Sequence, residues 1–85
     1  MQFREVPLVW YGMDEDVKVM GSFDGWIHGE HMSHESSASF TKFSTIIKLH
    51  PGRYEINFLV DGEWELSLEL QIVGKGLLEN NLLVV

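Results

Sequence analysis

The chain has 85 residues, a length that suits one domain with one modest hydrophobic core. Its formal net charge of −7 and its scattered basic residues argue against nucleic acids and anionic membrane surfaces as partners, because both require clustered Lys and Arg. No stretch is apolar over a length that could cross a bilayer. Cysteine is absent, which excludes a disulfide framework and a cysteine-based zinc site.

The first half of the chain predicts two short strands and a polar loop. Residues 1–7 are expected to form a lead-in, and the apolar residues 8–11 a first strand. Residues 17–20 alternate between apolar and polar side chains and predict a second strand. An Asp-Gly turn at 24–25 follows, and the serine-rich residues 28–39 are typical of a surface loop.

The clearest element is a hairpin over residues 51–66. One face of its first strand is apolar throughout, with Tyr54, Ile56, Phe58 and Val60. The Asp-Gly pair at 61–62 favours a type I′ turn, because both central residues of that turn need positive φ. A two-residue loop places Trp64 opposite Leu59 and on the face of Asn57, away from the core. A three-residue loop would turn Trp64 toward the core instead.

The remaining segments predict further strands and no helix. Residues 41–49 show the longest alternating pattern, residues 67–79 are irregular, and residues 81–85 read as a closing strand. Short strands with turn signals at intervals of about 8–12 residues are typical of an antiparallel two-sheet sandwich. The sequence therefore predicts an all-β module over residues 8–85.

Neither a metal site nor a catalytic site is expected. Three histidines at a spacing of three, His28, His31 and His34, would line one face of a helix, but their serine-rich segment has no helical apolar period. A solvated loop is therefore favoured, and we expect no metal or other cofactor. Acidic residues are plentiful, but nothing fixes two carboxylates at the separation that glycoside hydrolysis needs, and no nucleophile elbow is present. We expect no catalytic residues and no enzyme activity.

Two tryptophans follow the two Asp-Gly turns and suggest a binding surface. The rigid rings of Trp26 and Trp64 offer stacking area at a small cost in side-chain entropy. Asn57 and Asn80 add amide donors and acceptors. This combination suits a sugar, whose C–H face can stack on a ring while its hydroxyls bond to amides and Lys. The alternatives are rings that cover the end of the sandwich, or rings that anchor a protein partner.

Three motifs together resemble carbohydrate-binding module family 48, which includes the glycogen-binding domain of AMP-activated protein kinase β subunits. They are G-S-F-D-G-W at 21–26, P-G-R-Y-E-I-N-F-L-V-D-G-E-W at 51–64 and E-N-N-L-L-V-V at 79–85. Their order and spacing match the family from Leu8 to Val85. The runs P-L-V-W-Y-G-M and V-M-G-S-F-D-G-W are most similar to the plant Protein Targeting to Starch group, chloroplast scaffolds in which a coiled coil precedes such a module.

The resemblance implies an immunoglobulin-like antiparallel sandwich that binds α-1,4-glucan without cutting it. The ligands implied are starch, malto-oligosaccharides and cyclodextrin. The resemblance and the residue pattern give six candidate carbohydrate-binding residues: Trp26, Trp64, Asn80, Asn57, Lys75 and Leu78. Asn57 departs from the family, because the kinase domains carry a sugar-contacting Lys there, and Leu78 falls near a contact that is Thr in those domains.

The resemblance also implies a plastid location and a protein partner. In the scaffold group, the upstream coiled coil of the full-length protein is expected to contact granule-bound starch synthase. One alternative is a protein-interaction module that contacts a starch synthase or a kinase subunit, with sugar binding weakened or lost. Another is a packing module of a branching or debranching enzyme, in which Trp26 and Trp64 would be partly buried.

Overall fold

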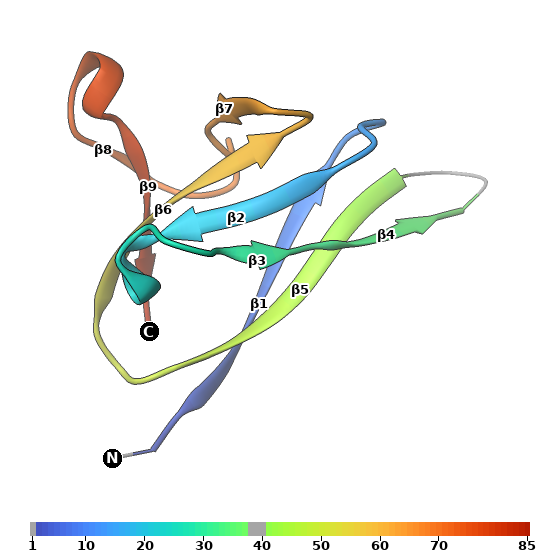
Figure 1. Cartoon of the computed structure of the whole chain (residues 1–85). Coiled ribbons are helices and arrows are strands. Elements are labelled where there is room, and N and C mark those ends of the chain that lie inside the picture. The colour runs from blue at the N-terminus through green and yellow to red at the C-terminus, as the bar shows by residue number, and fades with distance from the viewer. Residues whose placement is uncertain (1, 38–40) are drawn as a thin grey trace.

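The computed structural model describes residues 2–37 and 41–85 of the chain. In these residues, nine antiparallel strands form two sheets, and two short 3-10 turns are the only helical elements (Figure 1). The structure confirms the predicted all-β fold and is compatible with an immunoglobulin-like sandwich. No helix of the described residues has the length and apolar composition needed to cross a membrane.

The smaller sheet has the strand order β1-β5-β4. Its strands are β1 (Arg4–Tyr11), β5 (Thr41–Leu49) and β4 (Ser33–Ser36). β1 begins four residues before the expected Leu8, because its pairing with β5 continues as far as Arg4 and Leu49. Pro7 is compatible with this strand because β1 lies at the edge of the described sheet, where a missing backbone N–H is tolerated.

The larger sheet has the order β3-β2-β6-β9-β8, and β7 also pairs with β6. Its strands are β2 (Val17–Gly21), β3 (Glu30–His31), β6 (Arg53–Val60), β7 (Glu63–Glu65), β8 (Ile72–Val73) and β9 (Asn80–Val84). β6 therefore occupies the middle of the sheet and pairs with three other strands (Figure 1).

The prediction of a plain surface loop over residues 28–39 is wrong. β3 pairs with β2 in the larger sheet, and β4 pairs with β5 in the smaller one, so the chain crosses between the sheets at Met32. Met32 is buried, and its N–H donates to the carbonyl of Val17 at 2.9 Å. Both strands lie at sheet edges with exposed polar side chains, which is why the apolar alternation is missing. Residues 38 and 39 of the expected loop lie outside the described residues.

The segment between β7 and β9 is also more regular than expected. Within residues 67–79, which the sequence suggests are irregular, β8 pairs with β9, and η2 (Gly76–Leu78) forms one 3-10 turn. Two residues of strand and three residues of turn are too short to give a periodic sequence signal. β9 itself begins at Asn80, one residue before the expected start.

The central hairpin has the predicted turn and register. Asp61 and Gly62 have φ values of 49° and 84°, as a type I′ turn requires. Leu59 pairs with Trp64, and β7 ends at Glu65, opposite the buried Phe58. The side chain of Trp64 is therefore on the outer face of β6 and 59% exposed, which confirms the prediction that it points away from the core.

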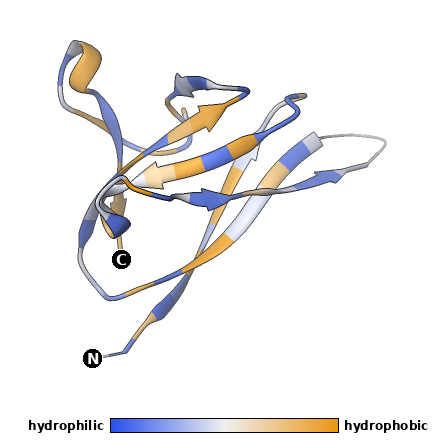
Figure 2. Ribbon diagram, viewed as in Figure 1, coloured by the Kyte–Doolittle hydropathy of each residue, from blue (hydrophilic) through white to orange (hydrophobic). Residues whose placement is uncertain are grey.

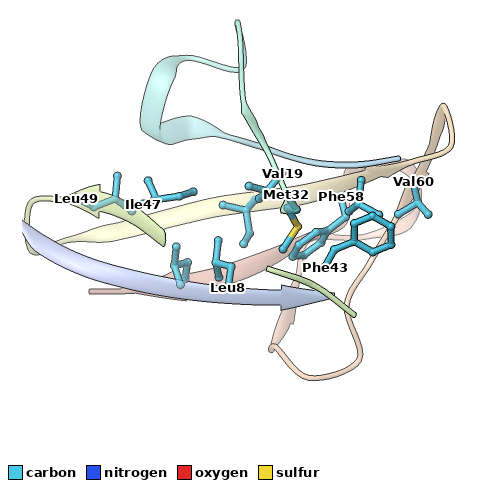
Figure 3. Close-up of a cluster of buried hydrophobic side chains, with 11 residues drawn as sticks. Leu8, Val19, Met32, Phe43, Ile47, Leu49, Phe58 and Val60 are labelled. Carbon is cyan, nitrogen blue, oxygen red and sulfur yellow. The ribbon is translucent and has the colours of Figure 1, made fainter. Parts of the chain in front are cut away.

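The core lies between the two sheets. β6 contributes Ile56, Phe58 and Val60, which are at most 2% exposed and belong to the face predicted from the period-two pattern. Figure 3 shows how side chains from the two sheets meet there. The labelled members of this cluster are Leu8, Val19, Met32, Phe43, Ile47, Leu49, Phe58 and Val60. The same alternation of apolar and polar residues is visible along β2 in Figure 2.

A buried asparagine fixes the segment that follows β7. Asn81 is fully buried, accepts a hydrogen bond from the N–H of Ser67 at 2.7 Å, and donates to the carbonyl of Ser67 at 2.9 Å. Its amide also reaches the carbonyls of Leu70 and Gln71 at 3.4 and 3.5 Å. One side chain on β9 thus supplies hydrogen bonds to backbone groups of the segment after β7. That segment forms no long strand that could pair these groups instead.

Asn81→Ala should destabilise the fold by about 2–4 kcal/mol, because it leaves buried backbone groups of Ser67 unpaired at about 1–3 kcal/mol each. Urea unfolding with an unchanged m-value measures this loss. Asn80→Ala is the matched control, since Asn80 is only partly buried and water can replace its bonds. Equal losses in the two variants would contradict the assigned role of Asn81.

Candidate functional site

The outer face of β6 carries a row of polar side chains. Because β6 alternates, the side chains of Arg53, Glu55, Asn57 and Leu59 point away from the core. Ile56 pairs with Asn81 of β9, so the same register places Asn57 beside Asn80 on this outer face. The sheet thus brings together two amides that are 23 residues apart in the chain.

A hollow of about 460 Å³ lies over this part of the sheet. Its lining residues come from β6, β7, β9, η2 and the loop after η1 (Ser22–Asp24): Trp26, Asn57, Trp64, Leu77, Leu78, Glu79 and Asn80. Five of the six candidate residues predicted from the sequence therefore line one hollow. Lys75, the sixth, precedes η2 and does not line it.

The backbone of Trp26 has an unusual conformation. Its φ is 65°, in the left-handed region that a bulky side chain rarely adopts, and it directly follows Gly25 with φ 69°. A non-glycine residue in this region costs on the order of 1–3 kcal/mol and persists only where its surroundings enforce it. The N–H of Trp26 donates to the carbonyl of Gly21 at 2.9 Å, which closes this turn after β2. The turn holds the ring of Trp26, 38% exposed, at the edge of the hollow.

The Asp24 carboxylate stabilises this strained turn. Its oxygens accept hydrogen bonds from the backbone N–H groups of Ile27, His28 and Gly29 at 3.3, 3.0 and 2.8 Å. These bonds, led by the one from Gly29, lower the pKa of Asp24 below its ordinary value of 3.8. Because three backbone donors surround one carboxylate, the loop that carries Trp26 depends on Asp24 being ionised.

A chain of hydrogen bonds orients the two amides at the bottom of the hollow. The Nδ2 of Asn80 donates to the Oε1 of Glu55 at 3.2 Å, and the Nδ2 of Asn57 donates to the Oδ1 of Asn80 at 3.0 Å. The Nδ2 of Asn57 also donates to the carbonyl of Glu79 at 3.2 Å, and its Oδ1 accepts from the N–H of Phe58 at 3.0 Å. Both amide hydrogens of Asn57 therefore have protein acceptors, whereas Asn80 keeps one N–H and one acceptor site for a ligand.

Two lining residues are missing from the sequence prediction, Leu77 and Glu79. Leu77 is fully exposed on η2 and stands beside Leu78, which is 79% exposed. Figure 2 shows this turn as a hydrophobic segment at the surface. Adjacent exposed leucines with no core to cover are a signal for a contact surface. That signal depends on knowing the exposure, which the irregular sequence around η2 does not give.

The three histidines are not gathered. Among residues 2–37 and 41–85, no three His, Asp or Glu side chains lie close enough together to hold a metal ion. His31 Nε2 lies 3.6 Å from Asp16 Oδ1, while the ring of His34 lies 4.9 Å from that of Phe43. β3 and β4 are extended, so a spacing of three alternates between faces instead of lining one.

Comparison with known proteins identifies the family. Residues 4–85 match the family described as the glycogen recognition site of AMP-activated protein kinase. The chain belongs to this family. The resemblance to carbohydrate-binding module family 48, predicted from three motifs, is therefore confirmed.

Three curated relatives cover nearly the whole chain. Protein PTST, chloroplastic, of Arabidopsis thaliana is 61% identical over 84 residues, which are 99% of this chain and 30% of the relative. Protein PTST homolog 2, chloroplastic, of the same plant is 42% identical over 82 residues, 96% of this chain and 15% of the relative. Protein FLOURY ENDOSPERM 6, chloroplastic, of Oryza sativa subsp. japonica is 39% identical over 84 residues, which are 99% of this chain and 15% of the relative. The chain thus spans less than a third of the length of each.

Acid should weaken the fold through Asp24. Its pKa is lower in the folded state than the ordinary 3.8, so the folded state binds fewer protons, and the contribution of Asp24 is complete above that value and is lost as pH falls through the folded pKa. We expect the difference in unfolding free energy between the wild type and Asp24→Asn to shrink from about pH 6 to about pH 2. Glu63→Gln, an exposed carboxylate on β7, is the control. A difference that stays constant over this range would contradict the assignment.

Proposed function

We propose that this chain is a non-catalytic α-1,4-glucan-binding module that holds a starch-synthesis scaffold on starch or malto-oligosaccharides. The observation that carries the proposal is one hollow in which two exposed tryptophans flank an amide with free hydrogen-bonding capacity. Membership of a glycogen-recognition family supports an α-glucan ligand. The names of the relatives support a location in the chloroplast. Cyclodextrin, a cyclic α-1,4-glucan, is expected to bind as a compact ligand of the same class.

In this proposal each lining residue has a distinct task. The rings of Trp26 and Trp64 stack on the C–H faces of successive sugar units, and both lose little side-chain entropy. Asn80 offers its remaining N–H and acceptor site to sugar hydroxyls. Asn57, whose amide hydrogens both bind protein acceptors, positions Asn80 instead of reaching the sugar as the family's Lys does. Leu78 adds apolar contact where the kinase domains carry Thr.

We expect the affinity to be modest. The hollow is open, and exposed rings bind sugars without deep burial, so a Kd on the order of 10 µM to 1 mM is expected, equivalent to about −4 to −7 kcal/mol. Lys75 lies outside the hollow in this structure and contributes only if the η2 loop adjusts to a bound chain.

A protein-interaction role is the second candidate. Trp64, Leu77 and Leu78 are all well exposed, and exposed aromatic and aliphatic side chains can also anchor a protein partner. In this alternative, the module contacts a starch synthase or a kinase subunit and its sugar binding is weakened or lost. In the main proposal, contact with granule-bound starch synthase belongs to other parts of the full-length protein.

Trp64→Ala should weaken malto-oligosaccharide binding at least about tenfold, because it removes one of two stacking surfaces. Its cost in stability should be about 1 kcal/mol or less, since the ring is mostly exposed and its strand position lies opposite Leu59 on the outer face. An NMR titration measures both proteins: in the wild type the indole N–H signals of Trp26 and Trp64 should shift together, and in the variant the Trp26 signal reports the weaker binding. Trp10 is the internal control, because its Nε1 already donates to Asp14 Oδ2 at 3.0 Å.

Two results of that titration would count against the glucan proposal. Shifts confined to Trp10 would place the sugar elsewhere. No shift at millimolar sugar, together with capture of a starch synthase by this module alone, would favour the protein-interaction candidate instead.

A Trp64→Ala variant that unfolds would show that the ring stabilises the sandwich, contrary to its exposure.

Glucan binding should depend little on salt, because the ligand is neutral and the stacking and amide contacts are short-ranged. We expect the Kd for a linear malto-oligosaccharide to change less than about twofold between low and moderate ionic strength, as measured by calorimetry. Loss of binding over that range would mean that charged groups dominate recognition, which disagrees with an uncharged sugar ligand.

A further inference from the structure

A second hollow, of about 250 Å³, adjoins the first one. Its lining residues are Ser22, Trp26, Arg53, Glu55 and Asn80. Trp26 and Asn80 line both hollows, so these two residues form the border between them. Neither Arg53 nor Glu55 lines the first hollow, which makes the second one a separate part of the same surface.

The two hollows follow one another along β6. Arg53, Glu55 and Asn57 occupy every second position and share the outer face. At about 3.3 Å per residue, Arg53 lies roughly 13 Å along the strand from Asn57. A linear chain that runs over Trp64 and Asn57 can therefore continue past Trp26 toward Arg53 along the same strand.

The second hollow has the chemistry of a hydroxyl-binding site. Glu55 accepts from Asn80, and its own N–H donates to Ser22 Oγ at 3.1 Å, so the carboxylate and the Ser hydroxyl are held in place. Arg53 is exposed and, among the residues that the structure describes, its side chain has no hydrogen-bond or ion-pair partner. A guanidinium has five N–H donors and no acceptor, so Arg53 adds several donors to a hollow in which the Glu55 carboxylate supplies acceptors.

We propose that the second hollow is an additional glucan subsite, in which Arg53 donates hydrogen bonds to sugar units beyond Trp26. The inference rests on the proposed function, because it extends the same neutral ligand along β6. The subsite makes the module selective for longer α-glucan chains. A short oligosaccharide occupies the tryptophan pair alone, while a longer one also reaches Arg53.

The test compares a short and a long ligand, maltotriose and maltoheptaose, by calorimetry. The wild type should bind maltoheptaose more tightly. Arg53→Ala should weaken maltoheptaose binding by roughly three- to tenfold, the range expected for an exposed hydrogen bond from a charged donor, and leave maltotriose binding unchanged. Arg53→Gln, which keeps most of the side-chain length, should show a smaller loss for maltoheptaose.

Lys48→Ala is the matched control, because it removes one exposed positive charge from β5 in the other sheet. It should change neither affinity. Equal weakening of both ligands by Arg53→Ala, or unchanged maltoheptaose binding, would overturn the subsite while leaving the glucan-binding proposal in place. Absence of binding to the wild type by either ligand would instead overturn the proposed function and the subsite with it.

Discussion

The alternation of side chains along β6 is the constraint on which the rest of the structure depends. Its inward residues, Ile56 and Phe58, are fully buried between the sheets. Its outward residues line both hollows, so the same eight-residue strand supplies the core and the candidate binding surface. A slip of one residue would exchange the two faces, and the type I′ turn at 61–62 prevents that slip for β7. The part of the candidate binding surface that β6 supplies is therefore positioned by the same strand pairing as the core beneath it.

The two tryptophans are positioned on this surface by different interactions. Trp64 is placed by the pairing of β7 with β6, so its position follows from hairpin register. Trp26 sits on a turn with a left-handed backbone, and three backbone bonds to Asp24 hold that turn in place. Strain of this kind is retained where the surroundings over-determine a conformation, and such positions cluster at functional sites. The hollow thus depends on a strand that is fixed by its pairing with β6 and on a loop that one carboxylate stabilises.

Sequence patterns predicted the parts of this molecule that have a local period or a specific turn. The hairpin, its register and the outward Trp64 follow from alternation and an Asp-Gly pair, and the structure confirms them. β3, β4 and β8 were missed because two to four exposed or edge residues give no period. Leu77 was missed for a similar reason, since a single 3-10 turn of three residues is too short to give a periodic sequence signal. The residue pattern and the resemblance both made Asn57 and Asn80 candidates, but the bond between their side chains became visible only in the structure.

Those hydrogen bonds explain what Asn57 does at the position where the kinase domains carry Lys. An ionised carboxylate only accepts hydrogen bonds, so Glu55 requires the NH₂ of Asn80 to face it. The Oδ1 of Asn80 must then face Asn57, and the NH₂ group of Asn57 donates a hydrogen bond to it. A Lys would add charge and reach, but it has no acceptor for the N–H of Phe58, which the Oδ1 of Asn57 binds. Asn57 thus fixes the orientation of Asn80 in place of a mobile donor, and a pre-oriented Asn80 would lose less entropy when a ligand binds.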